Sequence, residues 1–150
     1  MKKAENPAKV FLRRYVSLCG RVDALQRAID DAMSRAFSTN VTLKDVRVIS
    51  SPAEHDPMAS DVCNAVDACE LLYEYKARAE IVLREILEAV ESLPDETQKE
   101  LLTMRYIVGC GFPEIMNKMH YEKSQVFVIH GRALVQINKY LQAKELKNGA

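Results

Sequence analysis

Residues 113–134 read PEIMNKMHYEKSQVFVIHGRAL, and the spacing of apolar residues in this stretch decides how the C-terminal part of the chain folds. Pro113 and Glu114 are typical of a helix start. The apolar side of this short helix is formed by Ile115, Met116 and Met119. A second helix is expected from Lys123 to Leu141 or beyond, with five residues on its inner face: Val126, Ile129, Ala133, Ile137 and Tyr140. His120-Tyr121-Glu122 forms the turn between them. A short helix, a tight turn and a longer helix together predict a helix-turn-helix.

This assignment also predicts which residues face outward. With the apolar face turned to the core, the first turns of the last helix present Lys123, Ser124, Gln125, Val128 and Arg132. In a helix-turn-helix these turns enter the major groove of DNA. There Gln125 can pair with adenine, Arg132 or Lys123 with phosphate or guanine, and Val128 can touch a thymine methyl. Lys118 and Lys139 flank this surface as phosphate contacts, which completes the set of candidate DNA-binding residues.

Upstream of this motif, the chain contains two long heptad patterns and a short helix. Each long helix begins at an Asn-Pro or Asp-Pro pair, which suits a cap followed by the first helical residue. Apolar steps of three and four predict helices over about 7–37 and 57–92. The first seam comprises Phe11, Tyr15, Leu18, Val22, Leu25, Ile29, Ala32 and Ala36. The second comprises Ala65, Cys69, Leu72, Lys76, Ala79, Leu83, Ile86, Val90 and Leu93.

The resulting fold class is all-α, a long antiparallel heptad helical hairpin followed by a C-terminal helix-turn-helix. Two domains are expected, a hairpin over 1–93 and a helix-turn-helix domain over 94–150, with a break at Pro94 and a further helix from Glu96 to about Ile107. The loop 38–56 has no helical period. It either packs as a short extended piece or is mobile.

The net charge of zero hides a strong segregation of charge along the chain. The first 40 residues carry +4, residues 57–93 carry −5, residues 94–150 carry +2, and the intervening loop carries −1. A basic helix and an acidic helix favour pairing with each other. Homo-oligomerisation through the heptad helices, as in a four-helix bundle, is equally compatible with the pattern. No apolar run is long enough to span a membrane, and no secretory signal precedes the first helix, so a cytoplasmic protein is expected.

Catalysis and cofactors are not expected. The chain has neither a Gly-rich phosphate loop nor a nucleophile elbow, and its acidic helix lacks a histidine at Glu-x-x-His spacing. The four cysteines form no Cys-x-x-Cys pair, so His55, Cys63 and Cys69 are the only conceivable metal cluster, and small core residues are the simpler interpretation. We expect His130 to be a structural residue, since no partner for it stands out in the sequence.

Several segments taken together resemble a known family. These are LLTMRYIVG at 101–109, FPEI at 112–115, MHYEKSQV at 119–126 and IHGRAL at 129–134. They look like the fourth region of bacterial sigma factors. They resemble more closely a family of small phage and prophage proteins of unassigned function, related to phage late-gene transcriptional activators. The N-terminal half is similar too, in Arg13-Arg14-Tyr15, in VISSP at 48–52 with DPM at 56–58, and in Leu93-Pro94. Glu122, Ser124 and Val128 stand where the family often has Arg or Lys.

The resemblance implies a DNA-binding regulator of phage or prophage transcription that contacts RNA polymerase, with double-stranded DNA as its partner. An alternative is an oligomeric packaging or scaffold protein, because small terminase subunits also combine a helix-turn-helix with coiled-coil helices. Dimers on a palindromic site favour regulation, whereas rings with weak DNA binding favour packaging.

Overall fold

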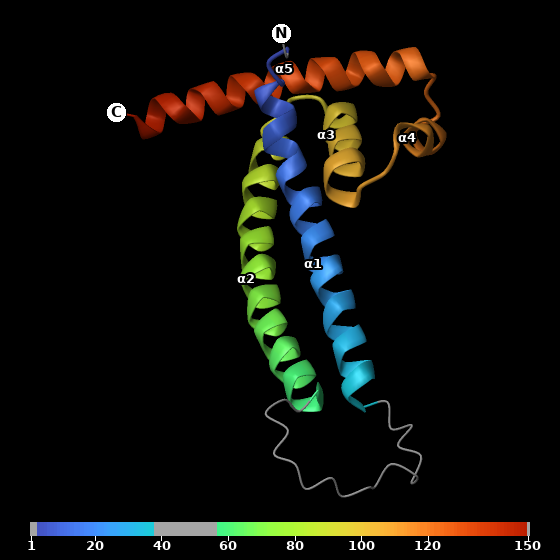
Figure 1. Cartoon of the computed structure of the whole chain (residues 1–150). Helices are drawn as coiled ribbons and strands as arrows, with labels where there is room; N and C mark the ends of the chain where they lie inside the picture. Colours follow the sequence, from blue (N-terminus) through green and yellow to red (C-terminus); the bar gives the residue numbers. More distant parts are fainter. Residues whose placement is uncertain (1–2, 38–56, 150) are drawn as a thin grey trace, which may run out of the picture. The chain divides into compact units, whose positions relative to one another are not determined.

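A computed structural model describes residues 3–37 and 57–149 of the chain (Figure 1). The described residues form α-helices and one π-helical segment, and no strand, so the predicted all-α class is confirmed. The elements are α1 (Pro7–Phe37), α2 (Pro57–Glu91), α3 (Glu96–Thr103), η1 (Met104–Val108), α4 (Phe112–Met119) and α5 (Lys123–Asn148). The loop 38–56, which includes His55, lies outside the described residues. The two alternatives given for this loop therefore stay predictions.

Local sequence signals account for where several of these helices begin. Asn6 caps α1, since its side-chain oxygen accepts a hydrogen bond from the backbone N–H of Ala8 at 3.0 Å. Asp95 caps α3 in the same way, accepting from the N–H of Thr97 at 2.9 Å. In each case the side chain satisfies one of the N–H groups that a helix leaves unpaired at its start.

The helix predicted over 96–107 changes its winding near its end. It runs as α3 to Thr103 and then widens into the π-helical η1, which ends at Gly109 in the left-handed conformation with φ of 88°. The N–H of Cys110 returns to the carbonyl of Met104 at 2.8 Å and closes this end. A side chain on Gly109 would be strained at that φ, which gives a physical reason for glycine here.

The chain divides into two compact units, and the division runs through both long helices. Unit 1 comprises Met1–Leu18 and Arg78–Ala150, and unit 2 comprises Cys19–Ala77. Our boundary after Leu93 differs from this division. The reason is that the ends of the long helices share one core with α3, η1, α4 and α5, made of Ala8, Leu12, Val82, Ile86, Ala89, Val90, Leu93, Leu101, Leu102, Tyr106, Cys110, Ile115, Val126, Ala133, Leu134 and Ile137.

Unit 2 has a much smaller buried set than unit 1. Among the residues of unit 2 that the structure describes, the buried apolar ones are Ile29, Ala32, Ala36, Ala65 and Leu72, three of which are alanines. Several larger apolar side chains of the same unit are exposed, among them Phe37, Val66 and Tyr73. Unit 2 therefore leaves apolar surface in water that its own helices do not cover.

Candidate nucleic-acid interface

α4 and α5 pack against each other, and both contribute fully buried residues to the core of unit 1. Ile115 on α4 and Val126 on α5 are both fully buried, and α3 packs against α5 as well. His120 ends α4 in the left-handed conformation with φ of 57°, and the N–H of the next residue, Tyr121, donates to the carbonyl of Met116 at 3.2 Å. The three residues 120–122 thus fix the angle at which α5 leaves α4.

The candidate residues on α5 are all exposed, but they occupy two sides of the helix. Ser124, Val128 and Arg132 are spaced by four and therefore lie along one outward face, with Val128 51% exposed. Gln125 and Lys139 border this face. Lys123 lies elsewhere, on a flank of the helix where its ammonium sits 5.9 Å from the ring centre of Phe127. The candidate set therefore forms an outward face and a separate basic flank.

Gln125 has a structural role that the sequence analysis did not foresee. Its side-chain oxygen accepts a hydrogen bond from the backbone N–H of Glu122 at 3.1 Å, which caps the start of α5. Reading adenine with both side-chain groups requires that same oxygen. While the cap is intact, this bond occupies one lone pair of the oxygen and orients the amide, which favours donation through its nitrogen over bidentate reading.

Lys118 is engaged within α4. Its ammonium lies 3.0 Å from the carboxylate of Glu114 and 3.8 Å from the sulfur of Cys110. The bond with Glu114 raises the pKa of Lys118, and the same bond lowers the pKa of the Glu114 carboxyl. Both side chains are about half exposed, so water screens the pair and phosphate can compete for the lysine.

A small hollow opens beside the outward face of α5. It has a volume of about 330 Å³ and is lined by Tyr121, Ser124, Gln125, Val128 and Ile129. Its walls are mostly apolar, and three of the five lining residues belong to the candidate set. A hollow of this character can accept a methyl group or the edge of a flat ring.

The sequence analysis missed an aromatic cluster on the flank of α5. Phe127, 44% exposed, packs on Phe112 with ring centres 4.8 Å apart, and the guanidinium of Arg105 lies 4.3 Å from the centre of the Phe112 ring. The ammonium of Lys123 lies over the ring of Phe127. Phe127 lies four residues beyond Lys123 and outside the predicted apolar face of α5, so the sequence already indicated an exposed aromatic residue beside a lysine. The position of Arg105 depends on the end of η1, and no pattern in the sequence indicated it.

His130 is buried in this cluster, as expected of a structural residue. Its ring meets the edge of Phe112 with centres 5.3 Å apart and stacks on Tyr106 at 5.8 Å. Burial first, and then the nearby charges of Lys9, Arg105 and Arg13, lower the pKa of His130 to about 4. The imidazole is therefore neutral at physiological pH.

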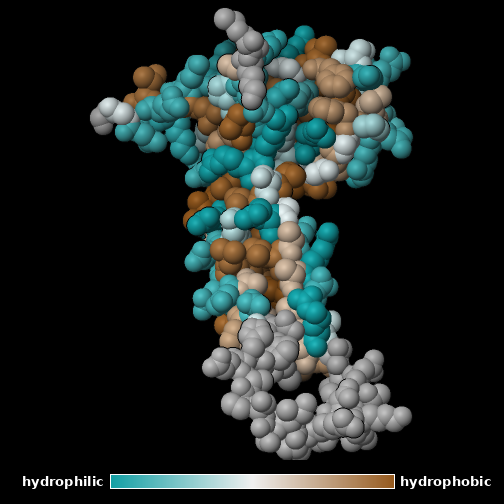
Figure 2. Space-filling view, in the orientation of Figure 1, coloured by the Kyte–Doolittle hydropathy of each residue, from teal (hydrophilic) through white to brown (hydrophobic). Residues whose placement is uncertain are grey.

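Grouping charge by packing unit also shows a segregation of charge. Unit 1 has 15 Lys and Arg against 11 Asp and Glu, a net charge of +4, whereas unit 2 has 6 against 10, a net charge of −4. The basic first turns of α1 belong to the same unit as α4 and α5. In Figure 2, hydrophilic residues cover much of the visible face of unit 1, with apolar areas among them.

None of the described helices combines the length and apolarity needed to cross a bilayer. Within the same residues, no group of three or more His, Cys, Asp or Glu side chains is arranged to hold a metal ion.

Comparison with models of known protein families, with curated protein sequences and with solved structures finds no match to this chain.

Proposed function

We propose that α4 and α5 form a helix-turn-helix and that the chain binds double-stranded DNA as a regulator of transcription. The observation that carries the proposal is the outward face of α5, where Ser124, Val128 and Arg132 are exposed on the first turns after a three-residue turn. A helix held this way by a shorter one is the arrangement that reads the major groove.

Four of the candidate contacts have a definite role in this proposal. Arg132 and Lys139 contact phosphates or, for Arg132, a guanine, and Val128 meets a thymine methyl at the edge of the 330 Å³ hollow. Gln125 donates one hydrogen bond to a base acceptor while its oxygen stays in the cap. The single-donor contact gives less discrimination than a bidentate one, so we expect modest specificity at that base pair.

The biological setting follows the family resemblance of the sequence. We propose that the DNA is a phage or prophage promoter and that RNA polymerase is a second partner. The net charge of +4 on unit 1 supports the DNA contact.

The proposal is tested by a gel shift at about 100 mM salt and by selection of bound DNA from a random pool. The full chain is compared with a Lys123→Ala/Arg132→Ala variant and with an Arg27→Ala/Lys76→Ala control, which removes two exposed cations from unit 2. We expect the first variant to lose retention and the control to keep it. Equal retention by both folded variants would refute the assignment of α5 as the recognition helix.

A second function remains a candidate because of the apolar surface of unit 2. Val62, Val66 and Tyr73 lie on α2 at spacings of four and seven, and their exposed fractions are 37%, 53% and 73%. We propose that α1 and α2 form an antiparallel hairpin and that a second copy of the chain covers this surface, as in a four-helix bundle. A packaging or scaffold protein would use the same surface to build larger assemblies.

The mass of the DNA complex separates these two functions. A dimer bound to an enriched palindromic sequence supports regulation. A ring of many copies, together with selection that enriches no sequence, supports packaging. A monomer at high protein concentration would contradict the role proposed for unit 2.

A further inference from the structure

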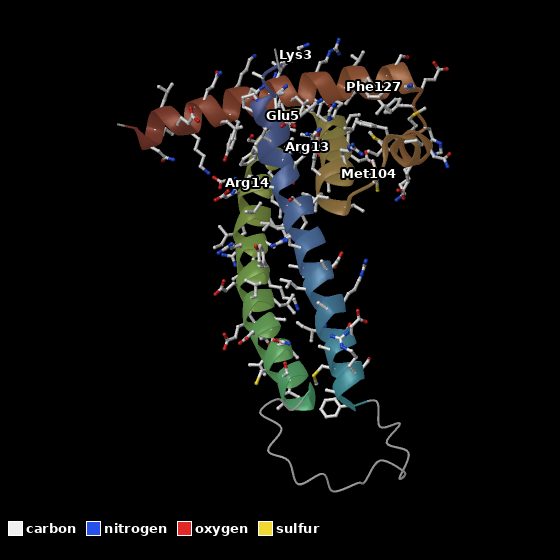
Figure 3. The ribbon with its side chains drawn as sticks, in the orientation of Figure 1. Lys3, Glu5, Arg13, Arg14, Met104 and Phe127 are labelled. Atoms are coloured by element: carbon white, nitrogen blue, oxygen red, sulfur yellow. The ribbon has the colours of Figure 1, made fainter. Side chains whose placement is uncertain are left out.

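The cap at the start of α5 fixes the orientation of the Gln125 amide. Its oxygen accepts the backbone N–H of Glu122 at 3.1 Å, and the side chain of Glu122 accepts the backbone N–H of Gln125 in return. Phe127, labelled in Figure 3, belongs to the same turn of α5 and locates it. Among the residues that the structure describes, the amide nitrogen of Gln125 has no hydrogen-bond partner. The cap therefore holds an unused donor at the exposed start of the helix.

This donor borders the hollow of about 330 Å³ beside α5. Val128 and Ile129 follow Gln125 by three and four residues, so they are its neighbours on the helix surface. Both line the hollow, and its walls as a whole are mostly apolar. The hydroxyl groups of Ser124 and Tyr121, which also line it, can each donate or accept and so do not select between bases. A hydrogen-bond donor thus lies beside an apolar recess.

The four bases differ in how well their major-groove edges match a donor beside an apolar recess. Thymine carries the O4 acceptor and the C5 methyl group on neighbouring ring atoms. Guanine offers acceptors without a methyl group, and adenine offers one acceptor next to its N6 amino group. Cytosine has its N4 amino group where thymine has O4, so two donors would face each other. Thymine is the one base that satisfies both the donor and the recess.

We infer that Gln125 and the hollow together recognise one thymine, with the Gln125 amide donating to O4 and the C5 methyl group entering the hollow against Val128 and Ile129. The inference rests on the proposed function, since it names the base that the start of α5 reads. No acidic or basic side chain lines the hollow, so the methyl group meets no charge there. Uracil lacks the methyl group, and 5-methylcytosine has an amino group in place of O4, so each of these bases loses one of the two contacts.

The experiment starts from the duplex that the full chain enriches from a random pool. Each thymine is replaced singly by uracil, 5-methylcytosine or cytosine, with the matching base on the other strand, and affinity is measured at about 100 mM salt. At one thymine we expect uracil to weaken binding about fourfold, as for one buried methyl group, and 5-methylcytosine about tenfold, as for a lost hydrogen bond and an unpaired donor. Cytosine loses both contacts and should bind most weakly at that position.

Gln125→Glu tests whether this residue reads that thymine. Glutamate keeps an acceptor for the N–H of Glu122, so the cap persists, but its carboxylate has no donor for O4. A carboxylate accepts from the N4 amino group instead, so we expect the variant to bind 5-methylcytosine more tightly than thymine at the same position. The control is Gln142→Glu, which adds the same charge at an exposed position of α5 outside the hollow and should keep the preference for thymine. Circular dichroism checks that both variants are folded.

The outcomes separate this inference from the proposed function. If uracil replaces every thymine without loss, or if Gln125→Glu keeps the preference for thymine, the inference is overturned. The proposed function then still stands, provided that Lys123→Ala/Arg132→Ala weakens binding. Binding that enriches no sequence would also overturn the inference, because no base is then read. Absence of any binding by the unmodified chain would overturn both.

Discussion

The phenol oxygen of Tyr106 lies 2.7 Å from Nε2 of His130, and this buried pair joins η1 to α5. Burial raises the pKa of Tyr106 and lowers that of His130 to about 4, so both groups are neutral near pH 7. A neutral phenol donates and a neutral imidazole nitrogen accepts, which fits the short contact. Protonation of the imidazole would place a charge in this buried site and would require the phenol to accept instead of donate.

This pair makes stability depend on pH. In the unfolded chain the His130 imidazole binds a proton near pH 6.5, whereas in the folded chain it does so only near pH 4. Between these values the unfolded state binds more protons, so the free energy of unfolding decreases as the pH falls. We expect up to about 3 kcal/mol of loss across this window from His130 alone.

The measurement is urea unfolding at about pH 7 and about pH 4.5, for the unmodified chain and for His130→Gln. Glutamine keeps an acceptor for Tyr106 but does not titrate, so the variant should lose less stability on acidification. The difference between the two chains cancels the carboxylates that they share. Parallel pH profiles would contradict the role assigned to His130.

The turn between α4 and α5 holds His120 in a strained backbone conformation, which a glycine would relieve. His120 adopts a φ of 57°, a conformation that costs side chains other than glycine roughly 1–2 kcal/mol. Replacing His120 by Gly should raise the free energy of unfolding by about 0.5–1 kcal/mol, after allowing for the greater freedom of glycine in the unfolded chain. Thermal unfolding measures the change. The control is His120→Ala, which keeps the strain, and a variant with Gly that is no more stable than the one with Ala would contradict the argument.

Gln98 on α3 is a polar residue in an apolar environment. It is only 8% exposed, and its side-chain oxygen has no hydrogen-bond partner among the described residues. An unsatisfied buried acceptor costs about 1–3 kcal/mol, so Gln98→Met, which keeps the length and removes the polar atoms, should stabilise the chain by about 1 kcal/mol. Denaturant unfolding measures this. A loss of stability in Gln98→Met would show that the amide is satisfied by ordered water.

The sequence predicted helices well because their signals are local. Asn6 with Pro7 and Asp95 mark helix starts, and the caps that they form are contacts within two residues. The apolar steps likewise predicted the inner face of the last helix in part: Val126 and Ala133 are fully buried, whereas Ile129 is only partly buried. The same helix also buries His130 and Leu134, which the steps did not include. Such features depend on neighbours in the chain, which periodicity captures.

Contacts between distant residues were not predictable in the same way. The side-chain nitrogen of Asn138 donates to the oxygen of Asn6 at 2.9 Å, joining residues 132 positions apart. No pattern in either helix indicates that pairing. For the same reason the predicted seam of α1, which begins at Phe11, did not include Ala8 and Leu12, although both are fully buried in a core shared with α3 and α5. The aromatic cluster around Phe112 depends on this packing and was equally hidden.

The shared core leads to a prediction about which parts of the chain are stabilised together. Leu12 on α1 and Leu72 on α2 are both buried leucines of the long helices, but Leu12 belongs to unit 1 and Leu72 to unit 2. Truncation of a buried leucine to alanine typically costs about 2–5 kcal/mol through lost contacts and the cavity that remains. Leu12→Ala should therefore destabilise α5, although Leu12 is more than a hundred residues away in the sequence.

Hydrogen exchange of the backbone amides of α5, around the fully buried Ile137, measures this effect. We expect faster exchange there in Leu12→Ala and little change in Leu72→Ala, which is the matched control because the same atoms are removed from the other unit. If the chain were divided after Leu93, neither variant would alter the exchange of α5. Equal protection of Ile137 in both variants would therefore restore the division predicted from the sequence, and selective loss in Leu12→Ala would establish that the first turns of α1 are part of the unit that carries α4 and α5.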